Sequence, residues 1–291
     1  MRKTSEVPFV KLHGLGNDFI VSDLGLGPAR TPGLAVLRSL AKSICERHTG
    51  IGADGFLLVT PPRRKGNSAR VRFFNADGSE AEMSGNGIRC AGAFLLRGSQ
   101  QKRPLRIETM AGVKVLKLVK QSGREWEFCV VMGAPVLQPE EIPFIASSVS
   151  TPVVQYRLGT NHGELRVTVT SMGNPHCSIF VKNFEQMDWP AVGCEIELHR
   201  HFPNRTNVEF IRVISRREIE VRFWERGVGV TASSGTGSCA AAVAAVLNGL
   251  TDRQVRVKTV AGTLQVEWPE GGEVVLRGPA QWIAEGLFTV T

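Results

Sequence analysis

The chain lacks the features that mark several classes of protein. No apolar run approaches the roughly 18–20 residues that a membrane-spanning helix needs. The first residues, MRKTSEVPFVKLHG, show neither the apolar core nor the small-residue cleavage site of a secretory signal peptide. We therefore expect a cytoplasmic protein that does not associate with a membrane.

Cysteine pairs and metal-ligand spacings are also missing. The six cysteines contain no CxxC pair, and the histidines and cysteines follow no metal-ligand pattern. An even number of cysteines could form disulfides in a secreted protein. In a chain of this size without a signal peptide we expect free thiols and no metal site.

Tyrosine is almost absent, since Tyr156 is the only one in 291 residues. The formal net charge is +8, but the basic residues are dispersed. Their densest cluster, PPRRKGNS at 61–68, lies between strand-like runs and is typical of a solvated loop. Without basic strands interleaved with aromatic residues, we expect a basic surface that attracts a small anionic substrate rather than a nucleic acid.

Short strand patterns fill most of the chain. Runs such as GFLLVT and EIEVRFWERG are rich in β-branched or aromatic residues and are bounded by Gly, Pro or Asn. Only three stretches have a helical pattern, at 33–50, 85–98 and 235–249. This distribution predicts an α+β fold rather than a regular alternation of strand and helix.

Two landmarks occur twice and in the same order. LGNDFIV (15–21) is echoed by MGNPHCSIFV (172–181), and SGNGIRCAGAFLL (84–96) is echoed by SGTGSCAAAVAAVL (234–247). Such a repeat indicates duplication. We expect two pseudo-symmetric domains, with the first formed by 1–133 and the C-terminal strand 278–291 and the second by 134–277. A ligand site between them is then the natural expectation.

Each second landmark places a serine just before Gly-x-Gly and a helix. Glycines at these corners let the backbone approach a ligand, and the free N–H groups of the first helical turn can bind a carboxylate. The alternative is a pair of glycine-rich helix starts that serve only as caps. The duplication favours a ligand site.

Polar residues near strand ends are further candidates for site residues, although each could also have a purely structural role. An isolated asparagine near glycine is often a turn former, and a lone histidine is often structural. Cys90 and Cys239 lie within the small-residue helices, which is typical of packed thiols.

The motifs together resemble the diaminopimelate epimerase family, in order and over nearly the whole chain. They are HGLGNDFIV, HTGIGADG, FFNADGSEAEMSGNGIRCAGA, SMGNPHC, FPNRTNVEF and WERGVGVTASSGTGSCAAAV. The resemblance implies two α+β domains, each a mixed sheet or barrel around a central helix, with the active site in the cleft between them. It also implies inversion at an amino-acid α-carbon without pyridoxal phosphate, metal or other cofactor, by a homodimer.

The resemblance assigns roles residue by residue. It implies that the candidate catalytic residues are Ser84, Ser234, His176 and Glu225. The substrate's α-carboxylate would be held by backbone N–H groups of Gly85, Asn86, Gly235 and Thr236. The distal end of the amino acid would be held by Asn17, Asn75, Asn174, Asn207 and Arg226, the last through a charge-assisted contact.

This chain departs from the family at the two acid/base positions, where the resemblance implies cysteines and the sequence has Ser84 and Ser234. Val230 likewise stands where glutamate is common. A thiol has a pKa of about 8.5, which a helix N-terminus lowers. A serine hydroxyl is far less acidic and needs a strong adjacent base.

Three hypotheses follow. The chain is an epimerase of LL- and meso-diaminopimelate with an adapted acid/base pair, or it carries a Cys→Ser change at both positions that disables the site. The third possibility is that the same fold binds an amino-acid-like ligand or catalyses another reaction.

Overall fold

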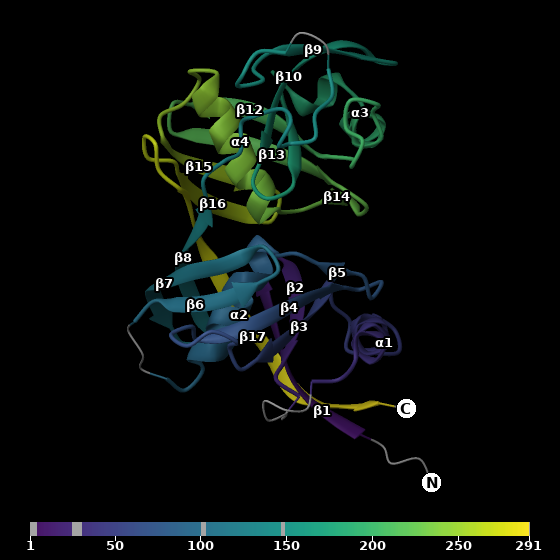
Figure 1. Cartoon of the computed structure of the whole chain (residues 1–291), viewed down its shortest axis with the longest axis vertical. Helices are drawn as coiled ribbons and strands as arrows, with labels where there is room; N and C mark the ends of the chain where they lie inside the picture. Colours follow the sequence, from purple (N-terminus) through teal and green to yellow (C-terminus); the bar gives the residue numbers. More distant parts are fainter. Residues whose placement is uncertain (1–4, 25–30, 100–102, 147–148, 291) are drawn as a thin grey trace. The chain divides into compact units, whose positions relative to one another are not determined.

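The computed structural model describes residues 5–24, 31–99, 103–146 and 149–290. The chain divides into two compact units (Figure 1). Unit 1 consists of Met1–Val130 together with Gly278–Thr291, and unit 2 of Val131–Arg277. The C-terminal segment thus returns to the unit that contains the N-terminus.

The described elements of unit 1 are mostly strands. Its helices are α1 (Leu34–Cys45) and α2 (Gly85–Leu96). Its strands are β1 (Ser5–Gly14), β2 (Asn17–Ser22), β3 (Gly55–Thr60), β4 (Ala69–Asn75), β5 (Glu80–Ala81), β6 (Leu105–Thr109), β7 (Gly112–Ser122) and β8 (Glu125–Gly133), which reaches into unit 2.

Unit 2 has a matching set of elements. Its helices are the short 3₁₀ helix η1 (Phe184–Gln186), α3 (Trp189–Glu197) and α4 (Gly235–Leu247). Its strands are β9 (Tyr156–Thr160), β10 (Gly163–Ser171), β11 (Pro175–Phe180), β12 (Asn207–Ser215), β13 (Glu218–Glu225), β14 (Gly229–Thr231), β15 (Gln254–Thr259) and β16 (Gly262–Glu267). Strand β17 (Val274–Val290) begins in unit 2 and continues through unit 1.

The two units repeat one order of strand pairing. In unit 1 the pairs β1–β2, β3–β4, β4–β5 and β6–β7 are antiparallel, and β2–β3 and β4–β6 are parallel. In unit 2 the pairs β10–β11, β12–β13, β13–β14 and β15–β16 are antiparallel, and β11–β12 and β13–β15 are parallel. The predicted α+β fold of two related halves is therefore confirmed.

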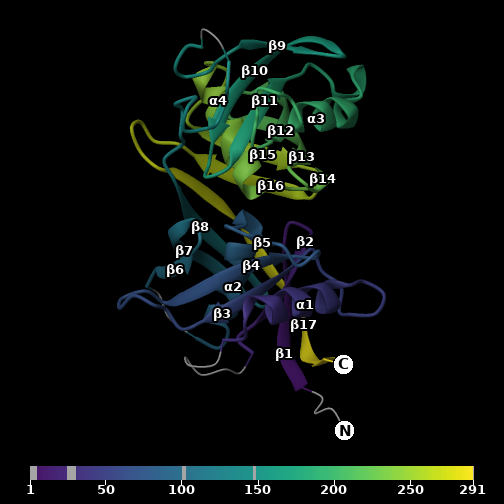
Figure 2. The same ribbon diagram turned by 45° about the vertical axis from the view of Figure 1, so that its right-hand side comes forward.

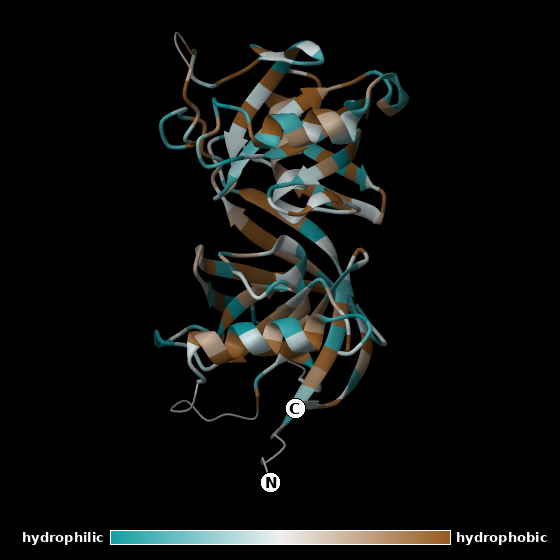
Figure 3. Ribbon diagram, turned by 90° about the vertical axis from the view of Figure 1, so that its right-hand side faces the viewer, coloured by the Kyte–Doolittle hydropathy of each residue, from teal (hydrophilic) through white to brown (hydrophobic). Residues whose placement is uncertain are grey.

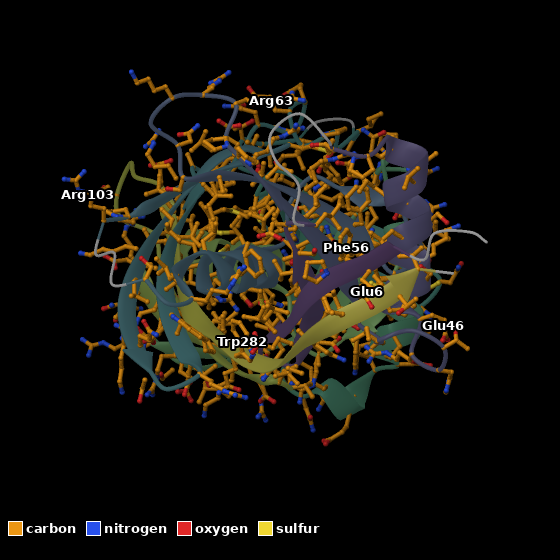
Figure 4. All side chains as sticks on the ribbon, turned by 90° about the horizontal axis from the view of Figure 1, so that it is seen from below. Glu6, Glu46, Phe56, Arg63, Arg103 and Trp282 are labelled. Atoms are coloured by element: carbon orange, nitrogen blue, oxygen red, sulfur yellow. The ribbon has the colours of Figure 1, made fainter. Side chains whose placement is uncertain are left out.

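A helix of small residues lies inside the sheet of each unit. In α2 every residue except Leu95 is buried, and the helix contacts β1, β2, β3 and β4. Figure 4 shows the strands of unit 1 curving around it. Such close wrapping requires short side chains, because a Cβ at Gly92 would lie only 2.9 Å from Leu116 Cδ2. Helix α4 is also mostly buried, except at Thr236, Val246 and Leu247, and contacts β10–β13, β15 and β16.

The apolar residues of strand β3 show how α1 and α2 come to pack on opposite faces of the sheet. Its first five residues are all buried, because α1 covers one face and α2 the other. Phe56 and Leu58 belong to the apolar cluster under α1. Leu57 alternates to the opposite face. Figure 3 shows the apolar and polar stripes of α1 that fit this packing.

Helix α3 was not among the predicted helices. It has only 9 residues, and its formation depends on local capping and on tertiary packing. The Asp188 carboxylate accepts from Ala191 N at 3.2 Å, and Pro190 occupies the first turn. Gly193 packs against Trp224, where a Cβ would lie 2.7 Å from the Trp224 Cβ.

The remaining sequence expectations concern cysteines, metals and membranes. All six cysteines lie among the described residues, and none of them forms a disulfide, as expected. The described residues contain no group of three or more His, Cys, Asp or Glu side chains that could hold a metal ion. In the same part of the chain, none of the helices has the length and apolar character required to cross a membrane.

Candidate active site

The corner of unit 1 is a serine-capped helix start. Ser84 has extended backbone angles and is the N-cap of α2, and its Oγ accepts from Gly87 N at 3.1 Å. Ser84 is half-buried, whereas Gly85 and Asn86 are buried in the first turn. The N–H groups of that turn have no partner within the helix. This geometry supports the predicted role of the corner in binding a carboxylate.

The corner of unit 2 has the same cap and one further group. Ser234 is buried as the N-cap of α4, and its Oγ accepts from Gly237 N at 3.3 Å. The same hydroxyl donates to Glu225 Oε2 at 3.0 Å. Desolvation raises the pKa of Glu225, and the hydrogen bond from Ser234 partly opposes the shift. A carboxylate therefore stands directly behind this serine.

Strand register identifies the position in unit 1 that corresponds to Glu225. Phe73 pairs with Ala81, and Phe223 pairs with Thr231, in each case three residues before the capping serine. Two residues further along the strand, Glu225 therefore corresponds to Asn75. The exposed Asn75 side chain donates to Ser79 Oγ at 2.9 Å. In unit 2 the Glu225 carboxylate accepts a hydrogen bond from the capping Ser234. The corresponding position in unit 1 holds the Asn75 amide, which is bonded to Ser79.

His176 lies on β11 in a fully buried hydrogen-bonded position. Its Nδ1 is 2.6 Å from Glu209 Oε1, and its Nε2 is 3.0 Å from Asn174 Oδ1. Two of the predicted site residues, Asn174 and His176, are thus brought together. Glu209 comes from β12, which runs parallel beside β11 (Figure 2). Sequence reasoning did not select Glu209.

The inner faces of the two sheets differ at three corresponding positions. In unit 2 they are occupied by the polar trio, which we define as His176, Ser178 and Glu209. The register of β2 with β3, and of β11 with β12, makes these equivalent to Phe19, Val21 and Leu57, the apolar trio of unit 1. The buried ionisable groups behind the unit 2 corner have no counterpart at these positions in unit 1.

Asn207 and Arg226, two further predicted site residues, are joined in unit 2. The Asn207 side chain donates to Pro175 O at 2.8 Å and accepts from Arg226 N at 3.0 Å. The Arg226 guanidinium donates to Asn204 O at 3.2 Å. Asn207 thus uses its amide to join three chain segments, and Arg226 is held at the end of β13.

In unit 1, Asn17 and Asn86 are joined in a chain of hydrogen bonds. Asn17 donates to Asp54 Oδ2 at 2.8 Å, and Asn86 Nδ2 donates to Asn17 Oδ1 at 3.3 Å. The fully buried Arg89 donates to Asn86 Oδ1 at 2.7 Å and to Gly85 O at 2.8 Å. Asp54 and Arg89 were not predicted as site residues. The sequence feature that could have identified Arg89 is its place as the one basic residue of helix α2.

The thiols next to the corners are poor substitutes for the acid/base pair. Burial raises the pKa of Cys90 to about 12 and the pKa of Cys177 well above its ordinary value. Cys239 is also buried. A buried thiol of this kind stays protonated at neutral pH and is a poor general base.

Replacing Gly237 by alanine is expected to lower the free energy of unfolding by about 1–3 kcal/mol. A Cβ at Gly237 would lie 2.9 Å from Phe223 Cδ1 and 3.0 Å from Glu209 Oε1. Gly159→Ala is the matched control, because no atom lies within 4 Å of the added methyl group. Chemical denaturation of both variants measures the effect, and equal stabilities would contradict this packing.

Comparison with known proteins places this geometry in a family. The family model for diaminopimelate epimerase matches residues 9–138 and 168–283. The chain is 46% identical over 284 residues to a diaminopimelate epimerase of Pelotomaculum thermopropionicum, covering 96% of this chain and 98% of the relative. It belongs to the diaminopimelate epimerase family. A diaminopimelate epimerase of Desulfitobacterium hafniense is 44% identical, covering 96% of this chain and 97% of the relative.

Solved structures share the fold at much lower sequence identity. A hydroxyproline epimerase from Agrobacterium vitis matches with a TM-score of 0.72 at 14% identity, over 100% of this chain and 94% of the other. A Bacillus anthracis phenazine biosynthesis protein of the PhzF family matches with a TM-score of 0.65 at 17% identity, over 97% and 98% of the two chains. These likenesses establish the fold.

Proposed function

We propose that this protein is a diaminopimelate epimerase, an isomerase that interconverts LL- and meso-diaminopimelate in the synthesis of lysine and of cell-wall precursors. Family membership over nearly the whole chain supports this substrate. The observation that carries the chemistry is the pair of serine-capped helix starts, one in each unit, with Glu225 hydrogen-bonded to Ser234.

The proposed reaction moves one proton on each face of the α-carbon. On one face, the Ser234 oxygen takes the α-proton while its own hydroxyl proton passes to the Glu225 carboxylate at 3.0 Å. On the other face, the Ser84 hydroxyl gives its proton to the carbanion. The N–H groups of both first turns stabilise the negative charge of the carboxylate as it spreads from the α-carbon. The reverse reaction starts from the Ser84 alkoxide and the protonated Glu225 and runs the same transfers backwards. Between turnovers, water returns a proton to Ser84 and takes one from Glu225.

We further propose that this chemistry proceeds without pyridoxal phosphate or metal, in a cytoplasmic homodimer. The family resemblance supports both expectations, and a small amino-acid substrate fits two carboxylate-binding corners. Sedimentation of the purified protein measures the oligomeric state. A monomer at all concentrations would contradict the dimer without affecting the proposed reaction.

Incubation of the purified protein with LL-diaminopimelate, followed by chromatographic separation of the isomers, tests the function. We expect meso-diaminopimelate to form with the wild type and not with a Ser84→Ala/Ser234→Ala variant. Calorimetric titration establishes whether both proteins bind the amino acid. Binding without conversion would instead support a disabled site or a binding protein, and absence of binding would indicate another substrate.

A further inference from the structure

The hydrogen bonds of His176 require more protons than a neutral imidazole carries. Both ring nitrogens face oxygen atoms, Glu209 Oε1 at 2.6 Å and Asn174 Oδ1 at 3.0 Å. A neutral ring has one N–H, and an amide oxygen only accepts. Two bonds therefore need either an imidazolium beside a carboxylate or a neutral ring beside a protonated Glu209. In both cases Nε2 carries a proton and a second proton lies between Nδ1 and Oε1.

Glu209 connects this ring to the unit 2 corner. Its Oε2 accepts from Ser178 Oγ at 3.4 Å, and its Oε1 packs against the first turn of α4 at Gly237. Desolvation raises the pKa of Glu209, and the imidazole and the serine hydroxyl partly oppose the shift. The carboxyl group is buried among β11, β12 and α4, and so its position is tightly defined.

The fold itself does not require these polar groups. Unit 1 builds the same strands and the same serine-capped helix with the apolar trio at the corresponding positions. Burying an ionisable pair costs desolvation free energy that an apolar trio avoids. The buried pair of His176 and Glu209 in unit 2 therefore points to a role in chemistry rather than in folding.

We propose that Glu209 is a positioning residue that fixes the protons of His176, keeping one proton between Nδ1 and Glu209 Oε1 and the other on Nε2, so that Nε2 is an N–H donor in the unit 2 site. This proposal rests on the proposed epimerase function, for which the family resemblance implies that His176 is a catalytic residue. The dyad has zero net charge in either arrangement of its protons. It can therefore donate from Nε2 without placing a net positive charge beside Glu225.

The variant Glu209→Gln tests the proposal, because it keeps the size of the side chain and removes the shared proton. We expect kcat to fall on the order of 10²-fold, with KM changed less than about threefold, as for an interaction made in the transition state. Ser178→Ala is the matched control, since it removes only the long 3.4 Å bond to the same carboxyl group. It should stay within about twofold of the wild-type kcat.

Nitrogen-15 NMR of the histidine rings gives a readout that does not depend on turnover. The wild type should show a strongly deshielded Nδ1 proton for His176, and Glu209→Gln should lose it while retaining the other histidine signals. If this proton is present but the wild type does not epimerise diaminopimelate, the proposed function fails and the proton placement stands. An unchanged His176 signal or an unchanged kcat in Glu209→Gln would overturn the proposal.

A triple variant separates positioning from folding. Replacing the polar trio of unit 2 by the residues of the apolar trio (His176→Phe, Ser178→Val and Glu209→Leu) should give a folded protein without activity. Its Tm is expected to equal or exceed that of the wild type. A Tm far below the wild type would show that the trio is structural, and this also would overturn the proposal.

Discussion

Changing both capping serines to cysteine (Ser84→Cys with Ser234→Cys) is expected to raise the rate of epimerisation by about 10²- to 10⁴-fold. Each serine is the N-cap of a buried helix, with its Oγ 3.1 or 3.3 Å from a glycine N–H. A thiol at a helix N-terminus has a lowered pKa and ionises near neutral pH. A serine hydroxyl does not, so proton removal is slow in the wild type.

Ser84→Cys alone and Ser234→Cys alone should each raise the rate of epimerisation less than the double change. The reason is that one face of the substrate needs the base and the other needs the acid. Ser233→Cys is the matched control. Ser233 is buried next to Ser234, its hydroxyl makes no hydrogen bond, and it does not cap the helix. We expect no gain from it. If the double variant binds diaminopimelate but gains no activity, the corners serve a different reaction.

Changing Glu225 to glutamine is expected to lower the wild-type rate on the order of 10²-fold. The Ser234 hydroxyl lies 3.0 Å from the Glu225 carboxylate, which can accept its proton, whereas a carboxamide cannot. Glu220→Gln is the control on the same strand. Glu220 forms ion pairs with Arg212 and Arg222 and is not a candidate site residue. Its activity should stay close to that of the wild type.

The same residue determines the expected pH dependence. Desolvation raises the pKa of Glu225 above its ordinary 4.5. Below the raised pKa the carboxyl group is neutral and cannot accept a proton, so activity falls as the pH drops through it. The acidic limb of the wild-type kcat profile should therefore have its midpoint above pH 4.5, and Glu225→Gln should lack this limb. A limb that persists in the variant would assign it to another group.

The sequence predicted the corners because their signals are local. A serine before Gly-x-Gly and a small-residue helix is an N-cap pattern, and the structure places Ser84 and Ser234 at those caps. The repeated motifs also predicted two related halves, because a duplicated sequence is expected to form the same strands and turns in each copy. Asn174 and His176 are two residues apart and are joined in the structure, whereas Asn207 and Arg226 are joined although they are 19 residues apart.

Glu209 shows what local patterns miss. It stands between Val208 and Phe210 on β12, and a charged residue between two apolar strand neighbours usually points to solvent. Here α4 covers that face, and this helix begins 26 residues further along the chain, at Gly235. Arg89 was missed for a similar reason, because its partners include Pro279 O on the distant strand β17.

Exchange of the α-proton with heavy water tests the central claim most directly. Diaminopimelate is incubated with the wild type in D₂O, and deuterium at the α-carbon is followed by NMR and mass spectrometry against a buffer blank. The account predicts deuterium incorporation that accompanies conversion of LL- to meso-diaminopimelate and is lost in Ser84→Ala/Ser234→Ala. Incorporation no greater than in the blank, with diaminopimelate bound, would contradict it.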